Sequence, residues 1–264
     1  MWINAEFTFD PLAEVTNQLK IFSTEKKFDL SELFLNSLEL SDVTKTLNKC
    51  EKPQNSQADL SFCELSLEDE TNLQNLIDDC RSLRISNTLS KSGFSGIFER
   101  QKTRLEHLEL VGITFRDDTH VVKILNTCPN LKSLNLAGIR LSSNSTSFSL
   151  VPLAITGLRN LVNLDLSFNS SWISDHNWVQ LFKGMEQLEE LTMNETKSDV
   201  QFESWLPNLV SFTARGSDLH WDSFFENFSI SDKITRVDVR FSNIDLSLPE
   251  ELQKVNPRIT EVLY

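Results

Sequence analysis

Histidine and cysteine are the residue types in this sequence best suited to bind a metal ion or to act as a nucleophile. The histidines lie far apart without the spacing of metal ligands, and the cysteines form no CxxC pair; these residues are His107, His120, His176, His220, Cys50, Cys63, Cys80 and Cys128. The motifs GxxxxGKS/T, GxGxxG, HExxH and GxSxG are also absent. We therefore expect a protein that is not an enzyme and that has no metal ion or cofactor.

Net charge limits the kinds of partner that the chain can bind. It has 25 lysine and arginine residues against 38 aspartate and glutamate residues, for a net charge of -13. Such a chain repels phosphate backbones and anionic lipids on average. No stretch reaches the roughly 18 apolar residues of a membrane-spanning helix, and residues 1–6 lack the pattern of a secretory signal. We predict protein partners, no nucleic acid and no membrane, and a cytoplasmic location with the nucleus as the alternative.

A motif of the form LxxLxL recurs along the chain. It is clear in four segments, and weaker copies surround them; the clear copies are Leu105–Leu110, Leu131–Leu136, Leu161–Leu166 and Leu188–Met193, and the weaker ones begin at Leu30, Gln57, Cys80, Leu209, Ile234 and Ile259. Successive copies begin 21 to 30 residues apart. A period of this length indicates stacked structural units, each too small to bury its apolar face alone.

Each unit is predicted to contain a strand and a short helix. Residues two apart on a strand face the same side, so the paired leucines of LxL point inward and the residues between them point outward. The second half has helical spacing, as in Glu68–Cys80, where Leu73, Leu76 and Ile77 follow an acidic first turn. Strands pack about 4.8 Å apart and helices roughly 8–10 Å apart, so stacking bends the sheet inward. The predicted fold is an α/β solenoid with a concave parallel sheet and convex helices.

Aromatic residues are numerous, with 18 phenylalanines and 5 tryptophans. Most occupy apolar positions of the repeat or apolar helix faces, so we expect core packing rather than a ligand cage; they include Phe62, Phe212, Trp178, Phe182, Phe224 and Phe225. The polar stretch Ser142–Ser149 lacks helical periodicity. We interpret it as a bulge on the outer face, with a contact loop as the alternative.

The segment Leu161–Asn169 matches the longer pattern LxxLxLxxN, and the repeats together resemble the leucine-rich-repeat superfamily of intracellular, irregular type. This resemblance covers almost the whole chain and implies a curved horseshoe. We predict one domain over residues 1–264 with about ten or eleven repeats, of which residues 1–29 form an N-terminal repeat or cap and residues 30–264 the others. The end at Tyr264 shows no polar capping unit, so we expect a further domain or another chain to cover it.

Two features resemble a narrower group within this superfamily. Cys50, Cys80 and Cys128 recur near predicted helix ends, as in the cysteine-containing repeats of ubiquitin-ligase substrate receptors. Leu161–Ser167 and Leu206–Phe212 resemble the repeat region of Zyg/Zer substrate receptors for cullin-two ligases. This resemblance implies an adaptor that binds a substrate together with elongin and cullin-two. The chain departs from that family in lacking a convincing elongin- or cullin-binding box and the armadillo-like domain, so a scaffold or inhibitor and the sensor region of an intracellular innate-immune receptor remain alternatives.

Outward-facing residues of the strands are the candidate contacts with a partner. They are Arg84, His107, Glu109, Asn135, Asn163, Asp165, Glu190, Thr192, Arg215, Arg236, Asp238 and Arg240. This face is acidic or neutral through the middle and basic near its C-terminal end. A partner segment with positive charge at its centre would be complementary to Glu109, Asp165 and Glu190. Alternatively, these residues are only the hydrophilic coat of the sheet, and the contacts lie on loops or elsewhere.

Overall fold

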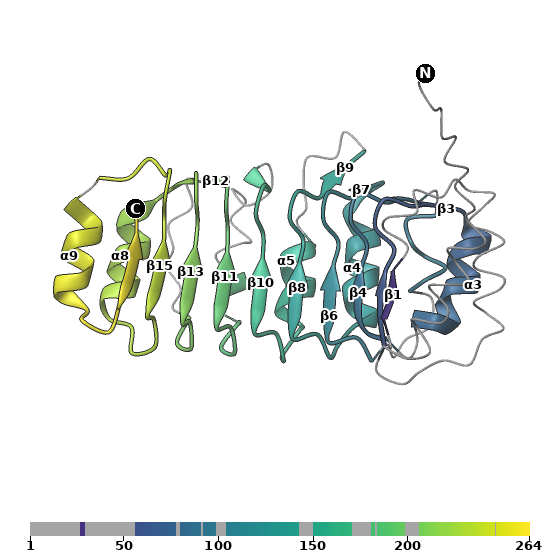
Figure 1. Cartoon of the computed structure of the whole chain (residues 1–264), viewed down its shortest axis with the longest axis horizontal. Coiled ribbons are helices and arrows are strands. Elements are labelled where there is room, and N and C mark those ends of the chain that lie inside the picture. Colours follow the sequence, from purple (N-terminus) through teal and green to yellow (C-terminus); the bar gives the residue numbers. More distant parts are fainter. Residues whose placement is uncertain are drawn as a thin grey trace, which may run out of the picture.

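A computed structural model describes residues 27–29, 56–77, 80–90, 92–98, 104–142, 150–170, 181–182, 184–198, 206–245 and 247–264. Within this part of the chain the main element is a ten-stranded sheet in which every neighbouring pair is parallel (Figure 1). Its strands, in spatial order, are β1 (Lys27–Asp29), β2 (Ser56–Asp59), β4 (Cys80–Arg84), β6 (His107–Glu109), β8 (Ser133–Asn135), β10 (Asn163–Asp165), β11 (Glu190–Thr192), β13 (Ser211–Thr213), β15 (Arg236–Asp238) and β16 (Glu261–Leu263). Spatial order follows chain order, so each repeat contributes one strand.

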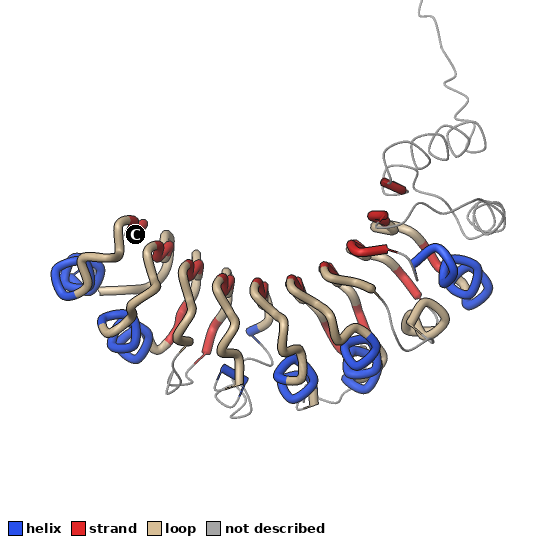
Figure 2. The backbone as a smooth tube through the Cα atoms, turned by 90° about the horizontal axis from the view of Figure 1, so that it is seen from below, coloured by secondary structure: helices blue, strands red, loops and turns tan. Residues whose placement is uncertain are grey.

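The remaining elements lie behind or beside this sheet. Three two-stranded pairs join successive repeats; they are β3 (Glu64–Leu65) with β5 (Leu89–Ser90), β7 (Thr114–Phe115) with β9 (Arg140–Leu141), and β12 (Lys197–Ser198) with β14 (Asp218–Leu219). The helices are α3 (Leu67–Ile77), α4 (Asp118–Thr127), α5 (Val151–Thr156), α8 (Trp221–Ser229) and α9 (Ser247–Val255). Figure 2 shows the main sheet on the concave side of a curved stack and the helices on the convex side. The predicted α/β solenoid is therefore confirmed.

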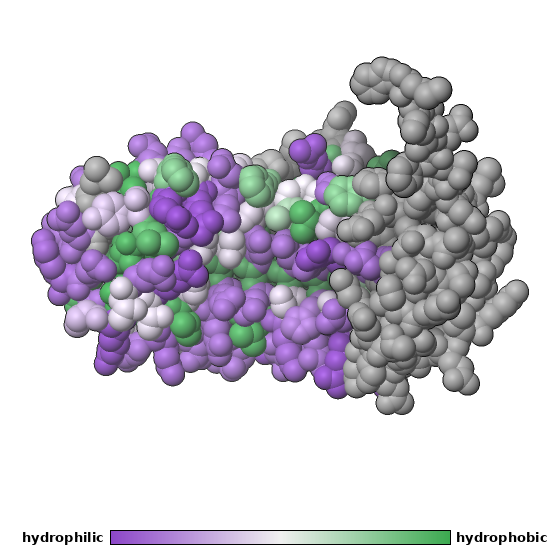
Figure 3. Space-filling view, viewed as in Figure 1, coloured by the Kyte–Doolittle hydropathy of each residue, from purple (hydrophilic) through white to green (hydrophobic). Residues whose placement is uncertain are grey.

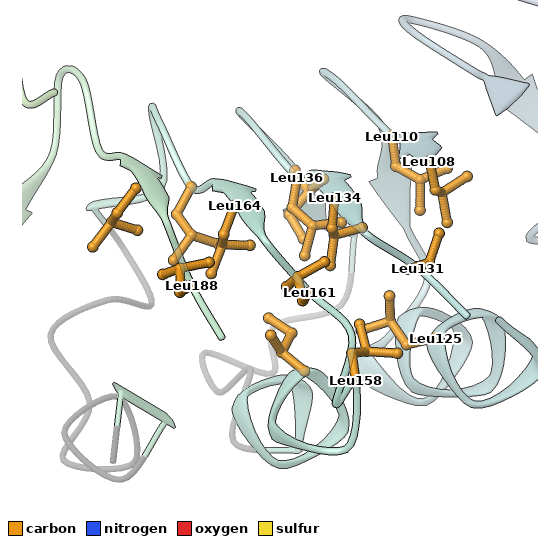
Figure 4. Close-up of a cluster of buried hydrophobic side chains, with 14 of the residues drawn as sticks. Leu108, Leu110, Leu125, Leu131, Leu134, Leu136, Leu158, Leu161, Leu164 and Leu188 are labelled. Atoms are coloured by element: carbon orange, nitrogen blue, oxygen red, sulfur yellow. The ribbon is translucent and has the colours of Figure 1, made fainter. Parts of the chain in front are cut away.

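Stacked leucines form the core between the two layers. The central strand residues Leu108, Leu134, Leu164 and Leu191 stand in register across four neighbouring strands and are all buried. Buried apolar residues two positions later and three positions earlier extend this packing into continuous rows; they are Leu110, Leu136, Leu166 and Met193, and Leu105, Leu131, Leu161 and Leu188. Figure 4 labels several of these leucines. Burial of one such side chain contributes about 1.5–3 kcal/mol, and every repeat adds several. The sheet is thus held by contacts between neighbouring repeats rather than by one central cluster.

The first two repeats have a different frame from the one that the sequence predicts. Phe28 pairs with Ala58, and Ala58 with Leu83, so strands β1 and β2 are centred on residues 28 and 58 rather than on the predicted Leu33 and Leu60, and the side chain of Ala58 is buried. The sequence pattern is misleading here because the inward residue at the centre of the strand, Ala58, is only weakly apolar. Gln57–Phe62 imitates LxxLxL, but its frame lies two residues after that of the strand. Phe62 consequently lies outside the core and is 50% exposed, whereas Ser61, predicted to face outward, is buried.

Other expectations about the core are confirmed where the structure describes them. Phe182, Phe212, Phe224 and Phe225 are buried. The helix predicted over Glu68–Cys80 is α3, which ends at Ile77. Trp178, Cys50 and most of the Ser142–Ser149 stretch lie outside the described residues.

The cysteines that the structure describes are all buried and none of them forms a disulfide; they are Cys63, Cys80 and Cys128. Burial, with a smaller contribution from the carboxylate of Asp59, raises the pKa of the Cys63 thiol to about 12. A thiol rather than a thiolate is therefore present at neutral pH, and only the thiolate is a good nucleophile or metal ligand. These observations favour a packing role for Cys63.

A residue with positive φ follows eight successive strands of the sheet, from β2 to β15. These residues are Phe62, Asn87, Gly112, Gly138, Phe168, Glu195, Gly216 and Phe241. The left-handed conformation costs a residue with a Cβ roughly 1–2 kcal/mol, which explains the glycines but not the phenylalanines. Each of these residues turns the chain away from the carboxyl end of its strand toward the convex side.

We predict that Leu164→Ala lowers the free energy of unfolding by about 2–5 kcal/mol, because it leaves a cavity between three repeats. Asn163→Ala, on the neighbouring residue of the same strand, should change it by less than about 0.5 kcal/mol, because Asn163 lies on the outward face. Urea denaturation of both variants measures the difference. Equal effects of the two substitutions would contradict the inward and outward assignment.

Candidate functional site on the concave face

The predicted contact residues lie in columns that cross the sheet. One column contains His107, Ser133, Asn163 and Glu190 in register, and continues through Ser211 and Arg236. A second column contains Arg84, Glu109, Asn135, Asp165, Thr192, Thr213 and Asp238. Arg215 and Arg240 follow the ends of β13 and β15. The concave face bearing these columns is largely hydrophilic (Figure 3).

The middle of this face contains a hollow of about 190 Å³. Its lining includes six of the predicted contact residues and no lysine or arginine; the lining residues are Glu109, Ser133, Leu134, Asn135, Asn163, Leu164, Asp165, Glu190 and Thr192. Three carboxylates and several amide or hydroxyl oxygens therefore surround one space. Such a set of acceptors suits an ammonium or guanidinium group, which supplies only donors. We call these residues the acidic hollow.

Glu109 at one side of the acidic hollow is already paired. The guanidinium of Arg84 donates from Nε to Glu109 Oε2 at 2.7 Å and from Nη2 to Oε1 at 3.1 Å. Arg84 Nη1 also lies 3.6 Å from Asp59 Oδ2. The hydrogen bond with Glu109 is the main cause of the raised pKa of Arg84. Uncompensated negative charge in the hollow therefore comes chiefly from Asp165 and Glu190.

Asp165 and Asn135 also stabilise the ends of their strands. Asp165 Oδ1 accepts a hydrogen bond from the Ser167 N–H at 2.9 Å, and Asn135 Oδ1 accepts one from the Ala137 N–H at 2.9 Å. These Asx turns satisfy backbone donors where the chain leaves the sheet. A substitution that tests charge at position 165 must therefore retain an acceptor, which Asn does.

A second cluster lies at the basic end of the sheet. Asp238 accepts hydrogen bonds from Arg215 Nε and Nη2 to Oδ2, at 2.8 and 2.6 Å, and from Arg240 Nε to Oδ1 and Nη2 to Oδ2, at 3.0 and 2.8 Å. Arg236 Nε lies 3.2 Å from Glu261 Oε2. Asp238, a predicted contact residue, has an exposed fraction of 0% and presents no surface to a partner. Its role is to hold Arg215 and Arg240, and we call these two residues with Asp238 the arginine clamp.

No family model matches this sequence, and no curated protein sequence matches it. Solved structures with a similar fold include TLR13 in a TLR13–ssRNA13 complex, with 18% identity and a TM-score of 0.55 over 89% of this chain and 35% of that one. This chain folds as a leucine-rich-repeat solenoid. A leucine-rich-repeat protein of Leptospira interrogans (17% identity, TM-score 0.49, 90% of this chain and 61% of that one) and yeast Rad7 from a complex with Elc1 (18%, 0.47, 96% and 83%) also match.

Two further properties of the solenoid bear on function. Within the residues that the structure describes, no helix combines the length and the apolarity needed to cross a bilayer. The same part of the chain contains no group of three histidine, cysteine or acidic side chains arranged to hold a metal ion. His107 lies exposed on β6, and His120 contacts Asp117 at the start of α4 through Nδ1 at 3.0 Å.

Sequence reasoning missed three exposed phenylalanines at the carboxyl edge of the leucine-rich-repeat sheet. Phe62, Phe168 and Phe241 have positive φ and are 50%, 62% and 88% exposed. Aligning the repeats on their strands would have revealed them, since they occupy the position that glycine takes in Gly112, Gly138 and Gly216. A phenylalanine in a glycine position is a signal that the LxxLxL pattern alone does not contain.

The arginine clamp should make the free energy of unfolding depend on pH in the acidic range. Burial alone would raise the pKa of Asp238, but hydrogen bonds from Arg240 and Arg215 outweigh burial and hold it at about 2. A carboxyl whose pKa is lower in the folded state than in the unfolded state stabilises the fold above its unfolded pKa, and this stabilisation disappears as pH falls toward 2. The shift corresponds to about 2 kcal/mol at pH 7.

We therefore predict that Asp238→Asn lowers the free energy of unfolding by at least about 2 kcal/mol at pH 7, and that the deficit shrinks by about half at pH 3. Urea titrations of both proteins at several pH values between 7 and 3 measure this. Asp232→Asn serves as the control, because the Asp232 pair with Arg258 is exposed on both sides. A difference in the free energy of unfolding that stays constant with pH would contradict the lowered pKa of Asp238.

Proposed function

We propose that this solenoid is a non-catalytic module that binds an extended segment of a partner protein across its concave sheet, with a basic residue of that segment in the acidic hollow. The hollow carries this proposal, because three carboxylates line it and Arg84, which lies outside the lining, pairs with Glu109 but leaves Asp165 and Glu190 to face the space. Complementary charge of this kind fixes register and speeds association. The net charge of -13 would further attract a basic segment.

The dimensions of the sheet support a peptide-like partner. Its ten strands, each about 4.8 Å from the next, make a face about 40 Å long, which accommodates on the order of 12 residues of extended chain. The acidic hollow spans strands β6 to β11, in the middle of this face. A segment centred there would leave both of its ends over the sheet.

The more specific role that we propose is substrate recognition in a cullin–RING ubiquitin ligase of the cytoplasm. The resemblance of Leu161–Ser167 and Leu206–Phe212 to Zyg/Zer repeats supports this role. Elongin and cullin-two would then be partners, the concave face of this single repeat domain would hold the substrate, and another subunit would transfer ubiquitin.

The two parts of the proposal are tested together by affinity capture of the tagged chain from its own cell lysate, followed by quantitative identification of bound proteins. We expect elongin and cullin-two among them, and we expect the substrates to fall about tenfold or more in the variant Asp165→Asn with Glu190→Lys. That variant keeps the Asx acceptor and changes the charge by three. Glu226→Lys with Glu251→Gln is the matched control, on exposed positions of α8 and α9.

Different outcomes contradict different parts. Absence of elongin and cullin-two would remove the ligase role and leave a scaffold, an inhibitor or a sensor. Equal capture by the hollow variant and the control variant would remove the concave site, because the two variants differ only in where the charge is changed. A folded state of both variants is verified beforehand by thermal denaturation.

A further inference from the structure

The arginine clamp carries excess positive charge, although the protein as a whole is acidic. Arg215 and Arg240 both donate to the carboxylate of Asp238, which Arg236 Nη2 also approaches to 4.0 Å, and Arg236 Nε lies 3.2 Å from Glu261, so three guanidiniums face two carboxylates here. The clamp therefore has one uncompensated positive charge at the carboxyl ends of β13 and β15. The carboxylate of Glu195, in the turn of the preceding repeat, lies beside Gly216 and reduces the positive potential there.

The two arginines of the clamp have more hydrogen-bond donors than Asp238 accepts. A guanidinium has five N–H groups, and Asp238 accepts from two nitrogens of each arginine, which leaves three N–H groups on Arg215 and three on Arg240 that Asp238 does not use. The two side chains are 42% and 38% exposed, so part of each guanidinium is open to the concave side. A carboxylate is the ligand that such a planar fork binds best within a protein segment.

The buried carboxylate also fixes the geometry of the clamp before any ligand binds. Arg215 is held further by its backbone N–H, which donates to Asn194 Oδ1 at 2.8 Å. Both long side chains have thus lost rotamer freedom during folding, and binding does not have to remove it again. The surroundings of Arg84 are the opposite, because that single guanidinium pairs with two carboxylates, those of Glu109 and Asp59.

Phe241 adds an apolar contact directly beside Arg240. Its side chain is 88% exposed and its φ is 64°, where the preceding repeat has Gly216. A phenylalanine in this left-handed conformation costs the fold about 1–2 kcal/mol, and so exposed a side chain recovers little of that cost by burial. Arginine and an aromatic residue together are typical of the residues that dominate binding energy at interfaces.

We propose that the arginine clamp binds an acidic residue of the partner segment, and that Phe241 contacts an apolar residue next to it. This inference rests on the proposed function, because it requires the segment to lie across the concave sheet. Asp165 and Asp238 are three strands apart, about 14 Å, which an extended chain covers in about four residues. The segment recognised therefore has a basic residue, about three intervening residues, an acidic residue and then an apolar one.

Fluorescence anisotropy at low salt with the full chain tests this directly. The probes are 12-residue peptides of serine and glycine that carry Lys at position 4, Glu at position 8 and Leu at position 9, or the same peptide with Gln at position 4, with Gln at position 8, or with phosphoserine at position 8. We expect the Lys–Glu–Leu peptide to bind at least tenfold more tightly than the peptide with Gln at position 8. Arg215→Gln with Arg240→Gln should abolish that preference and leave the preference for Lys intact.

Glu190→Lys should do the reverse, abolishing the preference for Lys while the preference for Glu persists. Where the double arginine variant fails to fold, adding Asp238→Asn removes the unpaired buried carboxylate and keeps the site uncharged. Equal binding of the Glu and Gln peptides by the unchanged protein overturns this inference and leaves the acidic hollow standing. Tighter binding of phosphoserine than of Glu would overturn it in favour of a phosphorylated segment, and no binding of any peptide would contradict the proposed function itself.

Discussion

Contact between the inward leucines of neighbouring repeats is the interaction on which the rest of the structure depends. Leu134 and Leu164 each sit between two equivalent apolar side chains, one on either neighbouring strand, so a repeat buries its apolar face only when both neighbours are present. This stacking sets the parallel register, and the register in turn arranges the outward residues in columns. The acidic hollow and the arginine clamp are therefore consequences of a packing rule that acts on the opposite face of the same strands.

The outward columns perform two tasks at once. Asn135 and Asp165 end their strands through Asx turns and also line the acidic hollow. Asp238 occupies the equivalent position near the C-terminal end, where it is fully buried and accepts hydrogen bonds from Arg215 and Arg240. The same column therefore offers hydrogen-bond acceptors in the acidic hollow, where its carboxylates line the open space. Near the C-terminal end it offers donors, because guanidiniums are bonded to its carboxylate there.

The fold and the membership of the columns were predictable wherever the leucine pattern is strong. From Leu105 onward every strand has the predicted frame, because alternation of leucines specifies which side of a strand is buried. The frame failed around Ala58, where the inward residue is small and a nearby Leu and Phe imitate the motif. The charged pairs were not predictable, since Arg84 with Glu109 and Arg215 with Asp238 are formed by residues more than 20 positions apart whose side-chain directions depend on the register.

Hydrogen exchange of the chain, alone and with its captured partner, tests the location of the binding surface most directly. We expect slower exchange on binding in β6 to β15 and in the turns that follow these strands, where the acidic hollow and the arginine clamp lie. We expect no change in α4, α5 and α8 on the convex side. Protection confined to those helices, with exchange in the strands unaltered, would contradict recognition by the concave face.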